Sequence, residues 1–203
     1  SNADYSDDMV ASLLDEIPKR GMPTLKQLTS GGSAALGELG MLAALKLLQF
    51  DVADHTSGII PVSDNGKAIN LLIPIDTFQE QLGALRSCLF DKEGERPDLL
   101  IAHISLDSLG KPSAICLTPV EIKARSGKLS SGERGKYLTQ AKYFASFLEK
   151  LSSAGEEHSL WGVAWRDLVC RMIDYGFRIY SQGGLDGDNL NWSAIHQDTI
   201  HSI

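Results

Sequence analysis

Two apolar runs joined by a short turn constrain the fold of this chain more than any other feature. The first run covers about 98–106 and opens with Asp98, and the second covers about 114–124 and closes with Glu121-Ile122-Lys123. The turn-rich segment Asp107–Pro112 lies between them. Runs of this kind, bounded by Gly, Pro and Asp, predict two neighbouring strands. We therefore expect acidic residues from two strands to meet at one edge of a sheet.

Patterns in the rest of the chain predict further strands and helices. Helices are expected where apolar residues recur at helical spacing, at about 34–50, 76–90 and 133–152. In the first of these the expected stripe is Leu36, Leu39, Ala43, Leu47 and Phe50. Strands at 58–62 and 68–74 flank a hairpin signal at 63–66. The aromatic-rich last fifty residues predict one more helix and one more strand. This order predicts an α/β fold with a mixed central sheet and helices on both faces.

Length and composition indicate one globular domain. The chain has 203 residues, of which 43% are hydrophobic and 22% are charged, as in ordinary globular proteins. Ser1-Asn2-Ala3 is interpreted as the remnant of an expression tag. We expect an N-terminal extension at 4–32, a core domain at 33–181 and a polar, weakly structured tail at 182–203.

The charge of the chain argues against a free-standing nucleic-acid binder. The net charge is −7, whereas such proteins are usually basic. One segment, 111–150, departs from this balance. Its basic residues are Lys111, Lys123, Arg125, Lys128, Arg134, Lys136, Lys142 and Lys150, and its acidic residues are Glu121, Glu133 and Glu149. The strand that ends in Glu121 is thus followed by local positive charge, which a phosphate backbone would sense.

Several other classes of site are disfavoured by the sequence. Cys88, Cys116 and Cys170 are widely spaced among apolar residues and predict buried thiols in a reducing, cytoplasmic compartment. The five histidines lack metal-ligand spacing, and His103 alternates to the sheet face opposite Asp98. There is no phosphate-binding loop and no Gly-x-Ser-x-Gly nucleophile motif, which disfavours an ATPase or a small-molecule hydrolase. No apolar run is long enough to span a membrane.

Four elements of the chain together resemble the PD-(D/E)XK nuclease superfamily, which has the restriction-endonuclease-like fold. They are Glu38 within Gly37-Glu38-Leu39-Gly40, Pro97-Asp98, Glu121-Ile122-Lys123, and Gln140-Ala141-Lys142-Tyr143. The resemblance covers about 33–152, the greater part of the expected nuclease core domain. In the commoner family pattern the tyrosine comes one residue later, where this chain has Phe144.

The resemblance implies metal-dependent hydrolysis of DNA. Asp98, Glu121 and the backbone carbonyl of Ile122 would hold Mg²⁺ or Mn²⁺, since these ions prefer oxygen ligands. Lys123 would orient the attacking water or neutralise transition-state charge, and period-two alternation would place it on the same face as Glu121. The resemblance also implies that Glu38 binds a second metal. Gln140 and Tyr143 would brace the site.

Alternative interpretations of these residues stay open. Glu121 and Lys123 could form an exposed ion pair, Asp98 could simply begin its strand, and Glu38 could be a solvated helix residue. The whole domain could be a catalytically silent nuclease fold used for DNA binding or assembly. The stretch Pro74-Ile75-Asp76 resembles nuclease domains joined to DNA-translocating ATPases in bacterial defence systems, which implies a larger machine with an ATPase partner. The sequence leaves open DNA against RNA, internal against terminal cleavage, and the oligomeric state.

Overall fold

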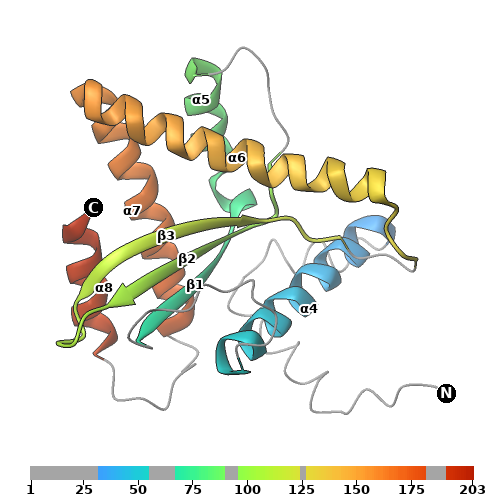
Figure 1. The fold of residues 1–203 in the computed structure, drawn as a ribbon, viewed down its shortest axis with the longest axis horizontal. Helices are drawn as coiled ribbons and strands as arrows, with labels where there is room; N and C mark the ends of the chain where they lie inside the picture. Colours follow the sequence, from blue (N-terminus) through green and yellow to red (C-terminus); the bar gives the residue numbers. More distant parts are fainter. Residues whose placement is uncertain (1–31, 55–66, 90–95, 124–126, 182–190) are drawn as a thin grey trace. The chain divides into compact units, whose positions relative to one another are not determined.

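The computed structural model describes residues 32–54, 67–89, 96–123, 127–181 and 191–203 (Figure 1). The chain divides into two compact units. The first unit contains Ser1–Ile59 and Ile122–Gly127, and the second contains Ile60–Glu121 and Lys128–Ile203. Among the described residues, no helix is long and apolar enough to cross a membrane.

The described part of the first unit includes helix α4, Gly32–Asp54, which confirms the expected helix at 34–50. The predicted buried face of this helix was wrong. Leu39 and Leu47 are 49% and 68% exposed. The helix instead buries Glu38, Met41, Leu42 and Leu48. Ala, Leu and Met surround the helix on every side, so hydrophobic spacing alone does not select a face.

The second unit contains a three-stranded antiparallel sheet with the order β1-β2-β3. Its strands are β1 (Ala68–Pro74), β2 (Leu99–Leu106) and β3 (Pro112–Val120). All three were expected, although β3 ends at Val120 and not at 124. The strand expected at 58–62 lies outside the described residues. The described strands pair only antiparallel, so a mixed sheet is not seen in this part of the chain.

A tight turn sets the register between β2 and β3. The Asp107 carboxylate accepts hydrogen bonds from the backbone N–H groups of Leu109 and Lys111, both at 2.8 Å. Gly110 has a φ of 78°, a conformation that residues with a side chain rarely adopt. Asp and Gly at these positions are therefore the local reason why the two apolar runs fold back on each other.

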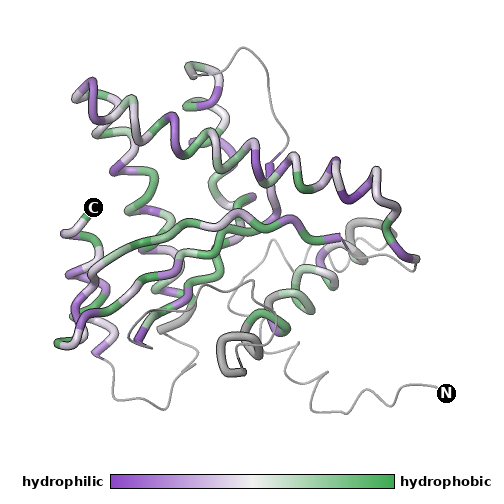
Figure 2. Tube along the Cα trace, in the orientation of Figure 1, coloured by the Kyte–Doolittle hydropathy of each residue, from purple (hydrophilic) through white to green (hydrophobic). Residues whose placement is uncertain are grey.

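Helices of the second unit pack on one face of this sheet. Figure 1 shows α6 (Ser131–Glu157) running alongside β3 in the opposite direction, with α7 (Ser159–Ser181) crossing behind the sheet. On β1, Leu71 and Ile73 point toward α7, where Gly176 allows close approach. The opposite face is buried too, since Leu72 and Ile101 are 3% and 0% exposed. Hydrophobic residues run along the strands and recur along α6 and α7 (Figure 2).

Helices occupy two places where the sequence suggested other structure. The expected strand after residue 160 is wrong within the described residues, because α7 is one continuous helix up to Ser181. Its buried residues Leu168, Val169, Met172, Ile173 and Phe177 recur at helical spacing, and aromatic content had suggested a strand. The tail expected to be weakly structured contains α8 (Trp192–Ser202), which is capped by the side chain of Asn191.

The remaining helices agree with the sequence. A short 3-10 helix, η1 (Ile75–Phe78), leads into α5 (Gln79–Leu89), as expected for 76–90. Helix α6 begins with a capping box, in which the Ser130 hydroxyl accepts from the Glu133 N–H at 3.3 Å and the Glu133 carboxylate accepts from the Ser130 N–H at 2.9 Å. The cysteine prediction was only partly right. Cys170 is half-buried, and burial raises the pKa of its thiol, but Cys88 and Cys116 are exposed.

Candidate functional site

Asp98 and Glu121 lie at the same end of the sheet. The last paired residues of β2 and β3 at this end are Leu99 and Val120. Asp98 directly precedes Leu99 and Glu121 directly follows Val120, so both residues adjoin the same terminal pair, just outside their strands. The carbonyl oxygen of Asp98 accepts a hydrogen bond from the N–H of Ile75, the first residue after β1, at 3.1 Å. The backbone of Asp98 is therefore tied to the end of β1.

Gln140 of α6 lies over the same end of the sheet. Further along α6, Leu148 lines a pocket together with Leu117 of β3. Gln140 comes eight residues before Leu148, about 12 Å along the helix, and Glu121 comes four residues after Leu117, about 13 Å along the strand direction. Because α6 runs antiparallel to β3, these two displacements have the same direction. One side-chain oxygen of Gln140 and one of Glu121 are buried.

A buried arginine that was not predicted packs against the same helix. Arg86 of α5 is 5% exposed, and its guanidinium lies 5.0 Å from the ring centroid of Tyr143. The rings of Phe144 and Phe147 are 6.0 and 5.7 Å away. Tyr143 follows Gln140 by about one turn of α6. The permanent positive charge of Arg86 therefore packs against the same part of this helix as Gln140. The spacing places Arg86 four positions after the buried Leu82, on the same face of α5, but this pattern alone does not predict that a charged side chain is buried.

Three other predicted site residues belong to the first unit. Glu38 is 7% exposed on α4, which excludes its interpretation as a solvated helix residue. Ile122 is half-buried and Lys123 is exposed. Glu121, Ile122 and Lys123 all follow the end of β3 at Val120. Strand alternation therefore does not fix the direction of the Lys123 side chain relative to that of Glu121.

The donor atoms at this sheet end suit a magnesium-type ion better than a closed metal site. Among the described residues, there is no group of three His, Cys, Asp or Glu side chains that could hold a metal. Structural zinc normally takes four protein ligands. Mg²⁺ keeps several waters and is usually held by one or two carboxylates together with substrate phosphates. Asp98 and Glu121 supply two such carboxylates, so the residues present fit Mg²⁺ or Mn²⁺.

His103 lies on the other face of the sheet, as expected. It is 4% exposed, and its Nδ1 lies 2.7 Å from the side-chain oxygen of Asn70, its partner residue on β1. Burial lowers the pKa of His103 below the ordinary value, which favours the neutral imidazole, with Nδ1–H donating to Asn70. This pair therefore satisfies polar groups inside the fold.

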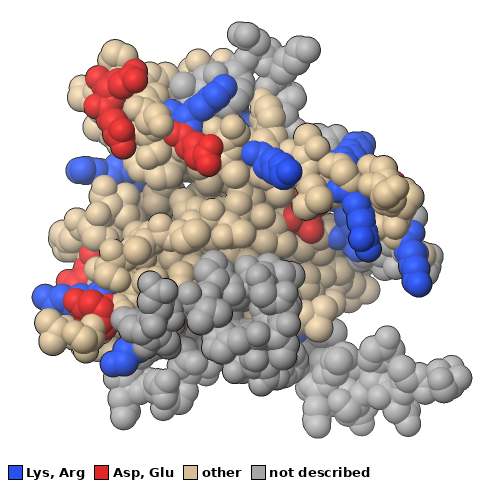
Figure 3. Space-filling model, in the orientation of Figure 1, with Lys and Arg blue, Asp and Glu red and all other residues tan. Residues whose placement is uncertain are grey.

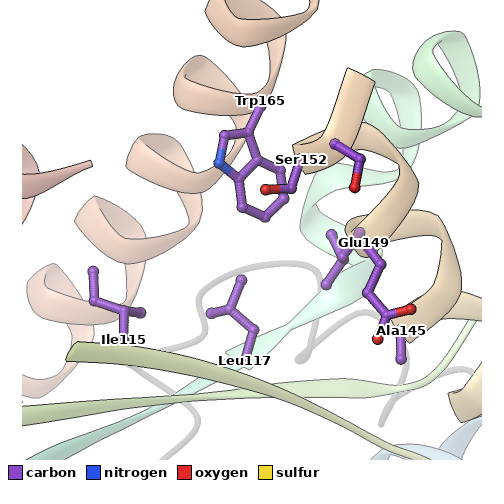
Figure 4. Close-up of a pocket in the computed structure, with 8 residues that line it drawn as sticks. Ile115, Leu117, Ala145, Glu149, Ser152 and Trp165 are labelled. Atoms are coloured by element: carbon purple, nitrogen blue, oxygen red, sulfur yellow. The ribbon is translucent and has the colours of Figure 1, made fainter. Parts of the chain in front are cut away.

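A surface pocket of about 360 Å³ opens between β3, α6 and α7 (Figure 4). Ile115 and Leu117 point into it from the strand, and Trp165 and Glu149 face it from the helices. Two serines, Ser152 and Ser153, complete its polar lining. The lining holds one carboxylate, Glu149, and no histidine or cysteine, so it lacks the histidine that usually activates a serine nucleophile. The paired carboxylates are the stronger candidate site.

Comparison of the chain with protein-family models, with curated proteins and with solved structures finds no significant match. The candidate site therefore rests on the residues of this chain and their arrangement.

Proposed function

We propose that this chain is a metal-dependent nuclease domain that hydrolyses phosphodiester bonds of DNA. The observation that supports the proposal is that Asp98 and Glu121 adjoin the same terminal residue pair, Leu99 and Val120, at one end of the sheet. The chain runs from helix α4 through strand β1, the inserted helices η1 and α5, and strands β2 and β3 to helix α6. This order is compatible with a restriction-endonuclease-like core and supports the resemblance drawn from the sequence motifs.

The proposed roles follow from the chemistry of the side chains. Asp98 and Glu121 would hold Mg²⁺ or Mn²⁺ through carboxylate oxygens, with the carbonyl of Ile122 as a further donor. A bound ion of this kind lowers the pKa of water and offsets negative charge on a phosphate. The buried Gln140 amide would keep the Glu121 carboxylate in a single orientation. The roles of Glu38 and Lys123 rest on the sequence resemblance, which assigns them to the same reaction.

Cleavage of linear and supercoiled duplex DNA with Mg²⁺ or Mn²⁺ tests the proposal. We expect Asp98→Asn and Glu121→Gln each to lower the cleavage rate at least about 100-fold, since each removes a metal-binding charge. Asp198→Asn and Glu149→Gln are the matched controls, because both carboxylates are exposed and outside the candidate site. Equal rates in all four variants would exclude the site.

A metal-binding measurement separates an active domain from a silent one. Mn²⁺ binding, followed by the loss of its solution electron paramagnetic resonance signal, should weaken in Asp98→Asn and persist in Asp198→Asn. If the wild-type protein binds duplex DNA but cuts none with either metal, the catalytically silent DNA-binding module becomes the better description. A DNA-translocating ATPase partner is part of the proposal only through the sequence resemblance, and co-purification of such a subunit from the source cells would test it.

A further inference from the structure

The charges on α6 are divided between its two ends. Between residues 127 and 144 the basic residues are Lys128, Arg134, Lys136 and Lys142, and the only acidic residue is Glu133. Between 145 and 158 the acidic residues are Glu149, Glu156 and Glu157, and the only basic one is Lys150. Figure 3 shows blue side chains around the N-terminal end of α6, at the right, and red ones at its C-terminal end. The basic end is the one that carries Gln140, next to the candidate site.

Four basic side chains lie around the start of α6, and we call this region the α6 basic surface: Lys128, Arg134, Lys136 and Lys142. Arg134 and Lys142 share one side of the helix, whereas Lys136 lies about 200° around it from Arg134. All four are exposed. Glu133 is engaged in the capping box with Ser130, so it is directed to the helix start. A side chain added at Gly132 or Gly135 would meet no atom within 4 Å. The surface between the cations is therefore open to a large ligand.

We propose that the α6 basic surface binds the phosphate backbone of duplex nucleic acid without reading its sequence. This inference rests on the proposed nuclease function and names the surface that delivers the substrate. Lysine and arginine on an outer helix face contact phosphates and position the protein, whereas base reading needs side chains inside a groove. Arg134 and Lys142 lie eight residues apart, about 12 Å along the helix, which is comparable to the width of the major groove of B-DNA.

Two observations favour a duplex over other polyanionic partners. Within the described residues 127–144, Tyr137 and Tyr143 are both partly buried, so no fully exposed ring is available to stack on the bases of a single strand. Leu138, at 60% exposure, is the one large apolar side chain exposed on this stretch. A protein interface would need a wider apolar centre. The acidic C-terminal end of α6 would repel the same backbone and so direct it toward Asp98 and Glu121.

Salt-dependent binding tests this inference without cleavage. The full chain is titrated with two labelled duplexes of equal length and unrelated sequence in EDTA, and fluorescence anisotropy is followed over a range of NaCl concentrations. The slope of log K against log salt is negative. We expect Arg134→Gln and Lys142→Gln each to reduce its magnitude by about one, and the double variant by about two. Lys111→Gln is the control, because it removes the same charge from the exposed turn at the other end of β3.

The outcomes separate a failure of the proposed binding surface from a failure of the proposed nuclease activity. Unchanged slopes for Arg134→Gln and Lys142→Gln, or an equal drop for Lys111→Gln, would overturn the surface. Strong preference for one duplex sequence, or tighter binding of a single strand, would overturn the proposal that the surface binds the phosphate backbone of a duplex independently of its sequence. Displacement of the duplex by poly-L-glutamate at equal charge would assign the surface to an acidic polypeptide. Binding is measured in EDTA, without any cleavage step, so a failure of cleavage leaves the binding result intact.

Discussion

Gly176 of α7 lies close against strand β1 of the sheet. A Cβ atom at this position would lie 3.0 Å from Cβ and 3.1 Å from Cδ1 of Leu71, and 3.2 Å from Cγ1 of Ile73. Leu71 and Ile73 are both 0% exposed, and both belong to β1, which is paired with β2. The Cβ of Leu71 is attached to this strand backbone and has no rotamer that moves it away. An alanine at 176 must therefore push α7 outward.

The magnitude follows from two opposing effects. Replacing glycine by alanine inside a helix stabilises it by about 1 kcal/mol, whereas adding a methyl to a well-packed core costs about 1–3 kcal/mol. We therefore expect Gly176→Ala to lower the free energy of unfolding by about 1 kcal/mol. The helix effect alone would raise it, so the sign of the change reports on the packing of α7 against β1.

Gly83 provides the matched control for this prediction. It lies within α5, is exposed, and has no atom within 4 Å of an added Cβ. Gly83→Ala should therefore raise the free energy of unfolding by about 0.5–1 kcal/mol through helix propensity. Urea unfolding followed by far-ultraviolet circular dichroism measures both variants. If Gly176→Ala is stabilised as much as Gly83→Ala, the close packing of α7 on β1 is wrong.

Two further predictions concern the start of α6 and the buried histidine. Ser130→Ala removes the capping hydroxyl from Glu133 and should cost about 1 kcal/mol in urea unfolding, whereas Ser130→Asp should retain most of the stability. Burial lowers the pKa of His103 from its ordinary value of 6.5, so the unfolded chain takes up a proton first. Folding stability should therefore fall as the pH drops below 6.5, by up to about 1.4 kcal/mol per pH unit. His103→Gln should reduce this fall, and an unchanged pH profile would contradict the buried neutral imidazole.

The structure refines the candidate site in ways that local patterns did not allow. Asp98 and Glu121 were expected at one sheet edge, and both adjoin the last paired residues of β2 and β3, Leu99 and Val120. The expected direction of Lys123 depended on a strand that ends earlier, at Val120. Arg86 was passed over because a charged residue is normally assigned to the solvent side of a helix. Its burial against three aromatic rings arises from the packing of α5 on α6, which no pattern within α5 specifies.

The sequence by itself determined the features that depend on neighbouring residues. The strand pair with its Asp107–Gly110 turn, the capping box of α6 and the helix at α4 all follow from hydrogen bonds and spacing within a few positions. Only the tertiary structure decided which face of α4 is buried, that α7 is helical throughout, and that Arg86 is buried against the rings of α6. These features depend on burial against segments distant in the chain. The free energy gained by burying apolar surface depends on the area removed from water and not on how far apart the contacting residues lie in the sequence.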